Sequence, residues 1–158
     1  MTGCQSPAPI RTEASVDLNR FMGDWYVIAC IPTFIETEAY NAVETYARGE
    51  GNRIDTTFTF NKGGFDGPLK EYNPTGFVSE ESDALWGMQF IWPIKAEYRI
   101  VYLDDNYTQT IIGRSKRDYV WIMARTPEIP EADYQKLLDI VAAEEYDLSQ
   151  IRKVPHEG

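Results

Sequence analysis

Hydrophobic and polar residues alternate along most of this chain with a period of two. In residues 53–61, for example, Ile54, Thr56, Phe58 and Phe60 share one parity and polar residues take most of the other. This period places alternate side chains on opposite faces of a β-strand, and turn-forming residues separate the segments. The pattern predicts eight strands, over residues 25–34, 42–48, 53–61, 69–79 (interrupted near Pro74), 84–91, 95–103, 107–114 and 119–125.

Mostly short turns join these strands in sequence order. That connectivity predicts an all-β fold, an eight-stranded up-and-down antiparallel β-barrel. Closure into a barrel removes exposed sheet edges. A barrel of eight strands also has room inside for one small ligand.

The periodicity changes at both ends of the predicted barrel. Residues 16–22 read as a short helical or turn entry with Asp17 as its N-cap. Residues 130–145 have helical spacing and predict one amphipathic helix packed on the outside of the barrel, and residues 151–154 predict a final edge strand. We therefore expect one barrel domain, residues 16–158, after a flexible N-terminal tether of residues 1–15. The predicted helix would bury Leu137, Leu138, Val141 and Tyr134.

Composition narrows the classes of function. The chain has 158 residues, 43% of them hydrophobic and 13% aromatic, and a formal net charge of −10. Such a charge repels phosphate backbones and argues against a nucleic-acid partner. A single histidine, His156, argues against a Ser-His-Asp triad and a histidine-rich zinc site. The sequence predicts neither a metal site nor a cofactor, and it contains no apolar run long enough to span a bilayer.

The parity of each strand indicates which side chains face the barrel interior. In residues 25–34 we take Trp25 as inward-facing at the base of the barrel and count alternate residues from it. In the other strands the face that carries the large apolar residues or the alternating set is taken as inward. Tyr102 shares its parity with the inward residues of segment 95–103. For each of these residues, contact with a ligand and simple core filling remain alternatives. The predicted inward set is Val27, Ala29, Ile31, Glu44, Tyr46, Phe58, Phe60, Trp86, Met88, Phe90, Tyr98 and Ile100.

Three separated motifs occur in a fixed order: Gly23-Asp24-Trp25-Tyr26, then Leu103-Asp104-Asp105-Asn106-Tyr107, then Trp121-Ile122-Met123-Ala124-Arg125-Thr126-Pro127. Together with the C-terminal helix, this order resembles the lipocalin family, and most closely its bacterial outer-membrane lipoprotein branch. The resemblance implies that the Arg125 guanidinium stacks on the Trp25 ring. Gly23, Trp25 and Arg125 would then form the structural floor of the barrel.

The resemblance also implies a function. It points to binding and transport or storage of a hydrophobic ligand, a fatty acid or lysophospholipid, with a role in membrane lipid maintenance under stress. It implies a binding protein rather than an enzyme. The implied oligomeric state is a monomer or a homodimer. An acidic Glu44 inside the barrel disfavours a free carboxylate nearby, unless Glu44 is protonated or paired with Arg99 or Lys95.

The open end of the barrel is predicted at the loops that follow the first, third, fifth and seventh strands. These loops carry apolar residues. Exposed apolar loops are typical of lipid or protein contact surfaces. Contact with a membrane during lipid pickup and folding of the loops over the cavity are the two alternatives. The residues concerned are Phe34, Ile35, Phe65, Ile91, Trp92, Pro93 and Ile94.

The segment around Cys4 resembles the end of a bacterial lipoprotein signal, with small residues before the cysteine and a Pro/Ser/Ala-rich stretch after it. The resemblance implies that Cys4 carries an acyl (palmitate) anchor. The protein would then sit on the outer membrane of a bacterium and face the periplasm, with the membrane surface as a partner. The alternative is a disordered head with a spare thiol.

Two other classes of function remain open. Some lipocalins use a cavity thiol as a nucleophile, and Cys30 is the candidate within the barrel strands. Its parity is opposite to that of Trp25, which predicts that Cys30 lies outside, under the helix, with no histidine near to activate it. The third class is an interaction protein that binds no ligand and has a filled interior.

Overall fold

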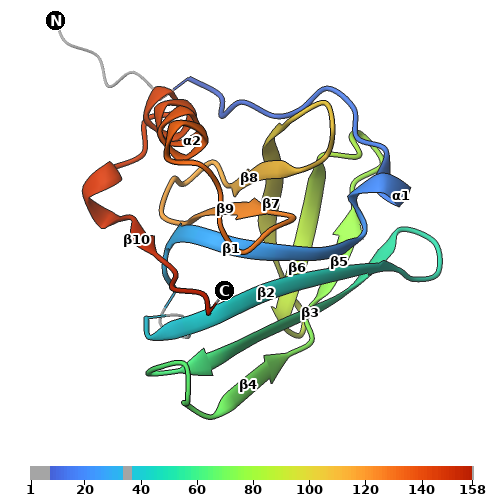
Figure 1. Cartoon of the computed structure of the whole chain (residues 1–158). Helices are drawn as coiled ribbons and strands as arrows, with labels where there is room; N and C mark the ends of the chain where they lie inside the picture. The colour runs from blue at the N-terminus through green and yellow to red at the C-terminus, as the bar shows by residue number, and fades with distance from the viewer. Residues whose placement is uncertain (1–7, 34–36, 158) are drawn as a thin grey trace, which may run out of the picture.

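The computed structural model describes residues 8–33 and 37–157. Within them the chain forms a closed antiparallel barrel with a helix on its outside, as predicted (Figure 1). The predictions for Cys4, Phe34 and Ile35 lie outside the described residues. The elements in chain order are α1 (Leu18–Phe21), β1 (Gly23–Ile31), β2 (Ala39–Arg48), β3 (Arg53–Lys62), β4 (Leu69–Tyr72), β5 (Thr75–Val78), β6 (Leu85–Ile91), β7 (Ile94–Leu103), β8 (Gln109–Gly113), β9 (Val120–Ala124), α2 (Glu131–Ala143), the 3-10 helix η1 (Leu148–Gln150) and β10 (Arg152–Lys153).

The barrel closes because β1 pairs with β2 through its first half and with β9 through its second. The strands between them follow sequence order, each antiparallel to the next. β4 and β5 both pair with β3 and share one position in the wall. Pro74 lies between them and has no N–H to donate to a ladder. The predicted fourth strand is therefore confirmed in two pieces, and β10 pairs with β1 as an added edge strand.

A β-bulge at Ile28 reverses the alternation of side chains in β1. Val27 and Ala29 pair with consecutive residues of β9, so Ile28 is an extra residue without a counterpart. Such a residue shifts every later side chain to the opposite face. The sequence prediction was therefore wrong for three residues. Ala29 and Ile31 face α2 rather than the interior, whereas Cys30 lies in the inner cluster with Val27.

The C-terminal segment provides hydrogen-bond partners for the backbone of this bulge. Val154 donates its N–H to the carbonyl oxygen of Ile28 at 2.9 Å. The Nε2 atom of His156 lies 2.7 Å from the carbonyl oxygen of Val27, within hydrogen-bonding distance. Buried carbonyl groups need such partners. The C-terminal segment thus stabilises the irregular part of the first strand.

A second bulge, at Val101, has the same effect in β7. Ile100 and Tyr102 pair with adjacent residues of β8, which leaves Val101 without a counterpart. Tyr98 and Ile100 face the interior as predicted, but Tyr102 packs against the outer cluster and Leu103 takes the inner position. The prediction that Tyr102 shares the face of Tyr98 was therefore wrong.

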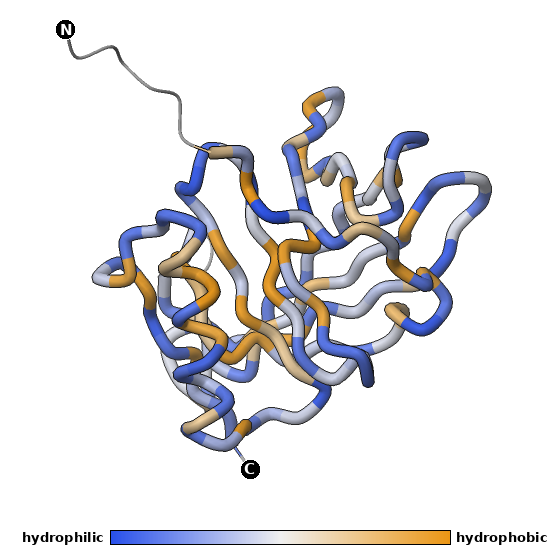
Figure 2. The backbone as a smooth tube through the Cα atoms, turned by 90° about the horizontal axis from the view of Figure 1, so that it is seen from above, coloured by the Kyte–Doolittle hydropathy of each residue, from blue (hydrophilic) through white to orange (hydrophobic). Residues whose placement is uncertain are grey.

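The helix α2 covers the outer face of the barrel wall. Tyr134, Leu137 and Val141 are buried there, as the helical spacing predicts, and Leu138 is partly buried. In Figure 2 hydrophobic segments lie along the strands and on the side of the helix that faces them. Among the described residues, no helix has the length and apolar character needed to cross a bilayer. At the other end of the fold, Asp17 caps α1 as predicted.

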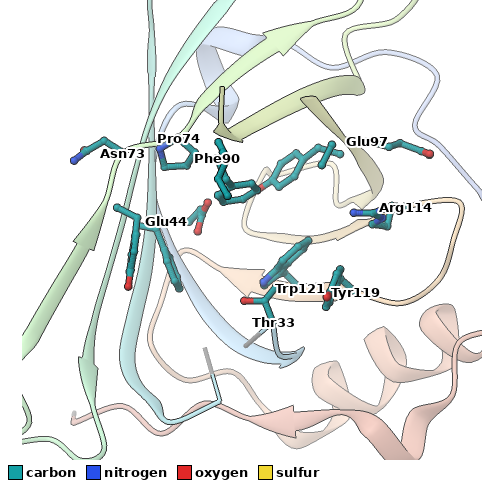
Figure 3. A pocket seen from close by; sticks show the side chains of 14 residues that line it. Thr33, Glu44, Asn73, Pro74, Phe90, Glu97, Arg114, Tyr119 and Trp121 are labelled. Atoms are coloured by element: carbon teal, nitrogen blue, oxygen red, sulfur yellow. The ribbon is translucent and has the colours of Figure 1, made fainter. Parts of the chain in front are cut away.

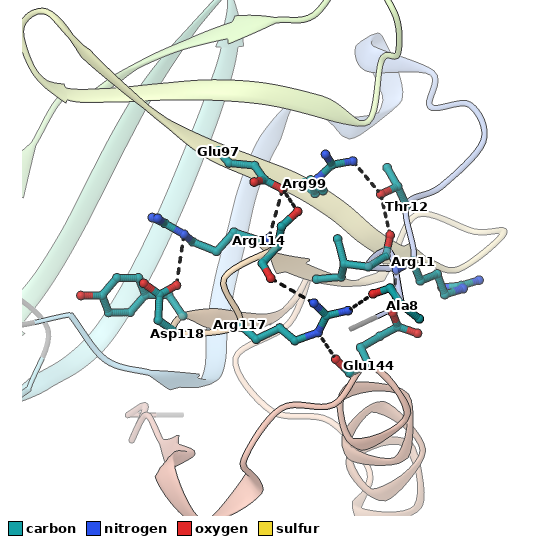
Figure 4. A network of polar contacts seen from close by, with 12 residues as sticks. Ala8, Arg11, Thr12, Glu97, Arg99, Arg114, Arg117, Asp118 and Glu144 are labelled. Carbon is teal, nitrogen blue, oxygen red and sulfur yellow. Dashed lines mark hydrogen bonds and ion pairs between the residues drawn. The ribbon is translucent and has the colours of Figure 1, made fainter. Parts of the chain in front are cut away.

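Residues 8–15 pack against the barrel, so the predicted tether is wrong for this part of the chain. Ile10 is only 6% exposed and belongs to the outer cluster under α2. The backbone N–H of Glu13 donates to a carbonyl oxygen of β7 at 2.9 Å. The Arg117 guanidinium donates to the carbonyl oxygen of Ala8 at 2.6 Å, within the polar network of Figure 4. A segment with these contacts is part of the folded domain.

Candidate ligand-binding site

Trp25 and Arg125 close one end of the barrel. Trp25 is fully buried, and the guanidinium carbon of Arg125 lies 3.8 Å from its ring centroid, which is the stack expected from the sequence. The indole Nε1 donates to the carbonyl oxygen of Phe21 at 2.8 Å, and Arg125 Nη1 donates to that of Asp24 at 2.9 Å. Gly23 has a φ of +98°, and a Cβ there would lie 3.4 Å from Arg125 Nη1. A glycine therefore suits both the turn and the close approach.

A layer of aromatic residues lies next to this closed end. Trp86 stacks on Tyr98 with ring centroids 5.7 Å apart and meets Tyr46 edge-on at 5.4 Å. The hydroxyl groups of Tyr46 and Tyr98 share a hydrogen bond. Burial raises the pKa of Tyr46 well above its usual value, and the nearby charge of Glu44 raises it further. Tyr46 and Trp86 are part of a packed core, and Tyr98 borders the cavity described below.

The packed core accounts for half of the residues predicted to face inward. These residues belong to the inner cluster of buried side chains. They lie behind the lining of the cavity described below and do not contribute to it. Core filling, one of the two alternatives from the sequence, describes them in this structure. They are Val27, Tyr46, Phe60, Trp86, Met88 and Ile100.

A cavity of about 590 Å³ occupies the rest of the interior (Figure 3). Its volume lies within the range typical of small-molecule sites. Four residues of the predicted inward set line it: Glu44, Phe58, Phe90 and Tyr98. The complete lining is Thr33, Glu44, Phe58, Tyr72, Asn73, Pro74, Phe90, Ile91, Ala96, Glu97, Tyr98, Arg114, Tyr119 and Trp121.

The loops that follow β1 and β8 and the end of strand β6 contribute to the lining, as expected for the open end. Ile91 at the end of β6 and Tyr119 before β9 belong to it. The turn between β6 and β7 also exposes large apolar side chains: Trp92 is 82% exposed and Ile94 is 66% exposed. Phe65, in the loop after β3, contacts Tyr40 at 5.3 Å between ring centroids and is not part of the lining.

Glu97 lines the cavity but is held by its neighbours. Its carboxylate accepts hydrogen bonds from the hydroxyl group of Ser115 at 2.6 Å and from the Ser115 backbone N–H at 3.0 Å. It also accepts a charge-assisted hydrogen bond from Arg99. Partial burial raises the pKa of Glu97, but the hydrogen bonds from Ser115 and Arg99 outweigh burial, and the pKa is lowered overall. Glu97 is therefore ionised at neutral pH.

Arg114 brings a positive charge to the cavity wall. Its Nε atom lies 3.1 Å from Asp118 Oδ1, and its guanidinium carbon lies 5.7 Å from the ring centroid of Tyr119. The backbone N–H of Arg114 donates to the Tyr146 hydroxyl group at 3.0 Å, which fixes the start of the loop between β8 and β9. In Figure 3 Arg114 and Glu44 lie on opposite sides of the cavity.

The two cations that the sequence offered as partners for Glu44 make other contacts. Arg99 bonds to Glu97 and, through Nη1, to the hydroxyl group of Thr12 at 3.2 Å. Lys95 places its Nζ atom 3.9 Å from the ring centroid of Phe77. Neither residue belongs to the cavity lining.

Sequence reasoning missed some strand residues of the lining and most of the lining outside the regular strands. Trp121 had a usable signal, because it shares the parity of Arg125 in segment 119–125. Ala96 likewise shares the parity of Tyr98. Arg114 and Thr33 follow the last residues of their strands, where alternation no longer predicts direction. Their positions depend on loop conformation.

Comparison with known proteins identifies the family. The family described as "Lipocalin-like domain" matches residues 16–156. Temperature-induced lipocalin-1 of Arabidopsis thaliana is 29% identical, covering 89% of this chain and 79% of that protein. Outer membrane lipoprotein Blc of Escherichia coli K12 is 27% identical, covering 100% and 91%. The fold matches lobster apocrustacyanin A1 with a TM-score of 0.71 at 12% identity, covering 98% of this chain and 94% of that one. The chain therefore belongs to the lipocalin family and is similar to its bacterial outer-membrane lipoprotein branch.

Proposed function

We propose that this lipocalin binds a fatty acid or lysophospholipid in the barrel cavity and transports or stores it. The observation that carries the proposal is a cavity of about 590 Å³ with a mostly aromatic and aliphatic lining. The end of the barrel at Trp25 is closed by a packed core. A single-ended apolar cavity of this size suits a flexible hydrocarbon chain.

Burial of the ligand's hydrocarbon chain would supply most of the affinity. Each buried methylene contributes about 0.8 kcal/mol, so about ten methylenes contribute roughly 8 kcal/mol before the cost of association. Arg114 offers a positive charge to a phosphate or carboxylate in the same cavity. Glu44 places a carboxyl group on the opposite side of the same cavity, so the orientation of the ligand depends on its head group.

We further propose that the protein is anchored to a bacterial outer membrane through an acyl chain on Cys4 and faces the periplasm. The sequence around Cys4 and the similarity to outer membrane lipoprotein Blc support this proposal. A role in membrane lipid maintenance under stress is supported by the similarity to a protein named temperature-induced lipocalin-1. The oligomeric state that we expect is a monomer or a homodimer.

Binding without chemistry is favoured over catalysis by the surroundings of Cys30. The bulge in β1 puts this thiol inside the barrel, contrary to the sequence prediction, but it is 1% exposed and is not part of the cavity lining. His156, the histidine of this chain, contacts the backbone carbonyl oxygen of Val27 and the ring of Tyr26, and it is not part of the cavity lining. A nucleophile needs both access to substrate and an activating base.

Filling the cavity tests the proposed function. Ala96 lines the cavity, and Ala96→Trp would place an indole there. We expect at least tenfold weaker binding of a fluorescent fatty acid and of lysophospholipid, with the fold preserved by circular dichroism. Ala142→Trp, on the exposed side of α2, is the matched control. Lipid extraction and mass spectrometry of freshly purified protein would identify the natural ligand. Equal affinity of the two variants would contradict binding in this cavity and favour an interaction protein.

A further inference from the structure

Arg114 places a guanidinium group on the cavity wall at the open end of the barrel. It follows Gly113, the last residue of β8, and lines the cavity together with Tyr119 at the other end of the same loop. Its side chain is 18% exposed, and in Figure 3 its guanidinium group points toward the cavity. Among the described residues that line this cavity, no other carries a guanidinium or an ammonium group. An anion in the cavity therefore has one cationic partner in the lining.

The protein uses the Arg114 guanidinium only in part. Its Nε atom lies 3.1 Å from Asp118 Oδ1 but makes no hydrogen bond to any residue that the structure describes. Within residues 8–33 and 37–157, the hydrogen bonds of Arg114 are made by its backbone groups. The terminal nitrogens Nη1 and Nη2 are therefore available to a ligand. They belong to the planar fork with which arginine binds a carboxylate or a phosphate through two parallel hydrogen bonds.

The loop that carries Arg114 is held in place by contacts of its own. The Tyr146 hydroxyl group accepts a hydrogen bond from the Arg114 N–H at 3.0 Å and donates one to the carbonyl oxygen of Tyr119 at 2.8 Å, which ties both ends of the loop. Between these ends, the Arg117 guanidinium donates to the carbonyl oxygen of Glu144 at 2.6 Å (Figure 4). A binding group on such a preorganised loop loses little conformational entropy when a ligand binds.

The acidic groups near the cavity leave Arg114 with one competitor. Glu97 already accepts a charge-assisted hydrogen bond from Arg99. Glu44 lies on the opposite side of the cavity. Asp118 contacts Arg114 directly and is 41% exposed, so solvent screens this ion pair and weakens it. An anion that binds Arg114 therefore competes with Asp118, whose carboxylate is already partly hydrated.

The position of Arg114 determines the orientation of a ligand whose anion it binds. Deeper in the barrel the lining is aromatic, with Phe58, and with Tyr98 and Trp121 at 5.9 Å between ring centroids. A hydrocarbon tail gains free energy by leaving water for this region, whereas an anion placed there would lose its hydration. At the open end the anion has both Arg114 and water as partners. The tail of the ligand therefore points inward.

We propose that Arg114 is the head-group residue of this cavity and binds the carboxylate or phosphate of a single-chain amphiphile that enters tail first. The anion takes the place of Asp118 on the guanidinium group. The inference deepens the proposed function and rests on it, because it takes the same cavity as the lipid site. The anion belongs either to a free fatty acid or to the phosphate of a lysophospholipid, since both offer a pair of oxygen atoms to the guanidinium fork.

Calorimetric titration with ligands of equal tail length tests this proposal. The set is dodecanoate, lauroyl lysophosphatidic acid, neutral monolaurin and dodecanedioate, each below its micellar concentration. In Arg114→Gln we expect dodecanoate and lysophosphatidic acid to bind about 10- to 100-fold more weakly, while monolaurin keeps its affinity. The anion with the larger loss is the one that the site favours. In the unmodified protein dodecanedioate should bind about tenfold or more weakly than dodecanoate, because tail-first entry would bury its second carboxylate.

Two further variants separate recognition of the anion from support of the fold. Lys116→Gln removes a positive charge from an exposed position of the same loop and should leave every affinity unchanged. Asp118→Asn removes the competing carboxylate and should tighten the binding of both single-ended anions several-fold, with no change for monolaurin. A purely structural role of Arg114 would not produce this gain.

The outcomes distinguish the proposal from the function on which it rests. Unchanged affinity for the anions in Arg114→Gln, or an equal loss for monolaurin, would overturn the role of Arg114. If that variant does not fold, unchanged anion affinity in Asp118→Asn would overturn it instead. Equal affinities for dodecanedioate and dodecanoate would overturn tail-first entry. Failure of all four ligands to bind the unmodified protein would overturn the proposed function itself.

Discussion

The guanidinium carbon of Arg125 lies 3.8 Å from the ring centroid of Trp25, although Trp25 is on the first barrel strand and Arg125 follows the last. Closure of the barrel makes these strands neighbours. The same guanidinium donates hydrogen bonds to the carbonyl oxygens of Arg20 at 2.8 Å and Tyr107 at 3.2 Å. Arg125 therefore connects α1, β1 and the loop before β8 at one end of the molecule.

Removing this contact should destabilise the closed end. We expect Arg125→Ala to lower the free energy of unfolding by about 3–5 kcal/mol, since it loses the cation–π contact and several charge-assisted hydrogen bonds. Arg125→Lys keeps the charge but not the planar fork, and should lose about 1–2 kcal/mol. Urea unfolding measures both. In a double-mutant cycle with Trp25→Ala, a coupling energy near zero would contradict the contact.

The barrel itself was predictable from the sequence, because strands such as β3 alternate between buried and less buried positions and polar turns separate the strands. The register inside two strands was not. The bulges at Ile28 and Val101 insert single residues whose side chains are as apolar as those beside them. The segment from Trp25 to Ile31 is apolar or aromatic at every position, so the sequence shows no break at Ile28, and counting alternate residues from Trp25 assigns Cys30 to the wrong face. The bulge in β1 is accompanied by a hydrogen bond from the backbone N–H of Val154, a tertiary contact that local sequence does not report.

The sequence predicted an apolar cavity inside the barrel and some of its lining residues, but not its depth or the loop residues that line it. Parity places Glu44, Phe58 and Tyr98 on the inward face, and the structure brings them into one lining. How deep the packed core extends depends on the volumes of facing side chains, which a single strand does not reveal. Arg114 lies in a loop, and its position depends on tertiary contacts, including the hydrogen bond that its backbone N–H donates to the hydroxyl group of Tyr146.

Asp104 should make the stability of the protein sensitive to acid. Its carboxylate accepts hydrogen bonds from the backbone N–H groups of Thr108 at 2.6 Å and Gln109 at 2.8 Å. Partial burial raises the pKa of Asp104, but these bonds and one from the Thr108 hydroxyl group outweigh burial and lower it. The stability that Asp104 contributes is therefore present above its unfolded pKa of about 3.9 and is lost as the pH falls through the lower folded value.

The variant Asp104→Asn checks this expectation. Its free energy of unfolding should lie below that of the unmodified protein at pH 7, and the difference should shrink as the pH falls below about 4. Chemical unfolding across this range provides the measurement. Asp105→Asn serves as a control in the same turn, because the hydrogen bonds named above go to Asp104. A difference that stays constant down to pH 2.5 would contradict the role of the Asp104 carboxylate.

Tyr146 should produce the opposite dependence at high pH. Burial raises its pKa to about 12, and its hydroxyl group donates to the carbonyl oxygen of Tyr119 at 2.8 Å. Because the folded value exceeds the unfolded value of about 10, the stabilisation is complete below pH 10 and is lost as the pH rises toward 12. Tyr146→Phe should cost about 1–3 kcal/mol at pH 8 and flatten the decline above pH 10. Unfolding by urea at pH 8, 10 and 11.5 tests both effects, with Tyr72→Phe as an exposed control.

The exposed turn between β6 and β7 should speed the exchange of ligand with membranes. Trp92 is 82% exposed beside the cavity residue Ile91, so it is not folded over the cavity. Indole rings favour the membrane–water interface, where contact would bring the cavity close to the lipids. We expect Trp92→Ser to slow the transfer of a fluorescent fatty acid to vesicles several-fold while leaving its affinity in solution unchanged. Leu148→Ser, an exposed apolar change on η1, should leave both unchanged. Equal transfer rates for the Trp92 variant and the unmodified protein would argue against membrane contact through this turn.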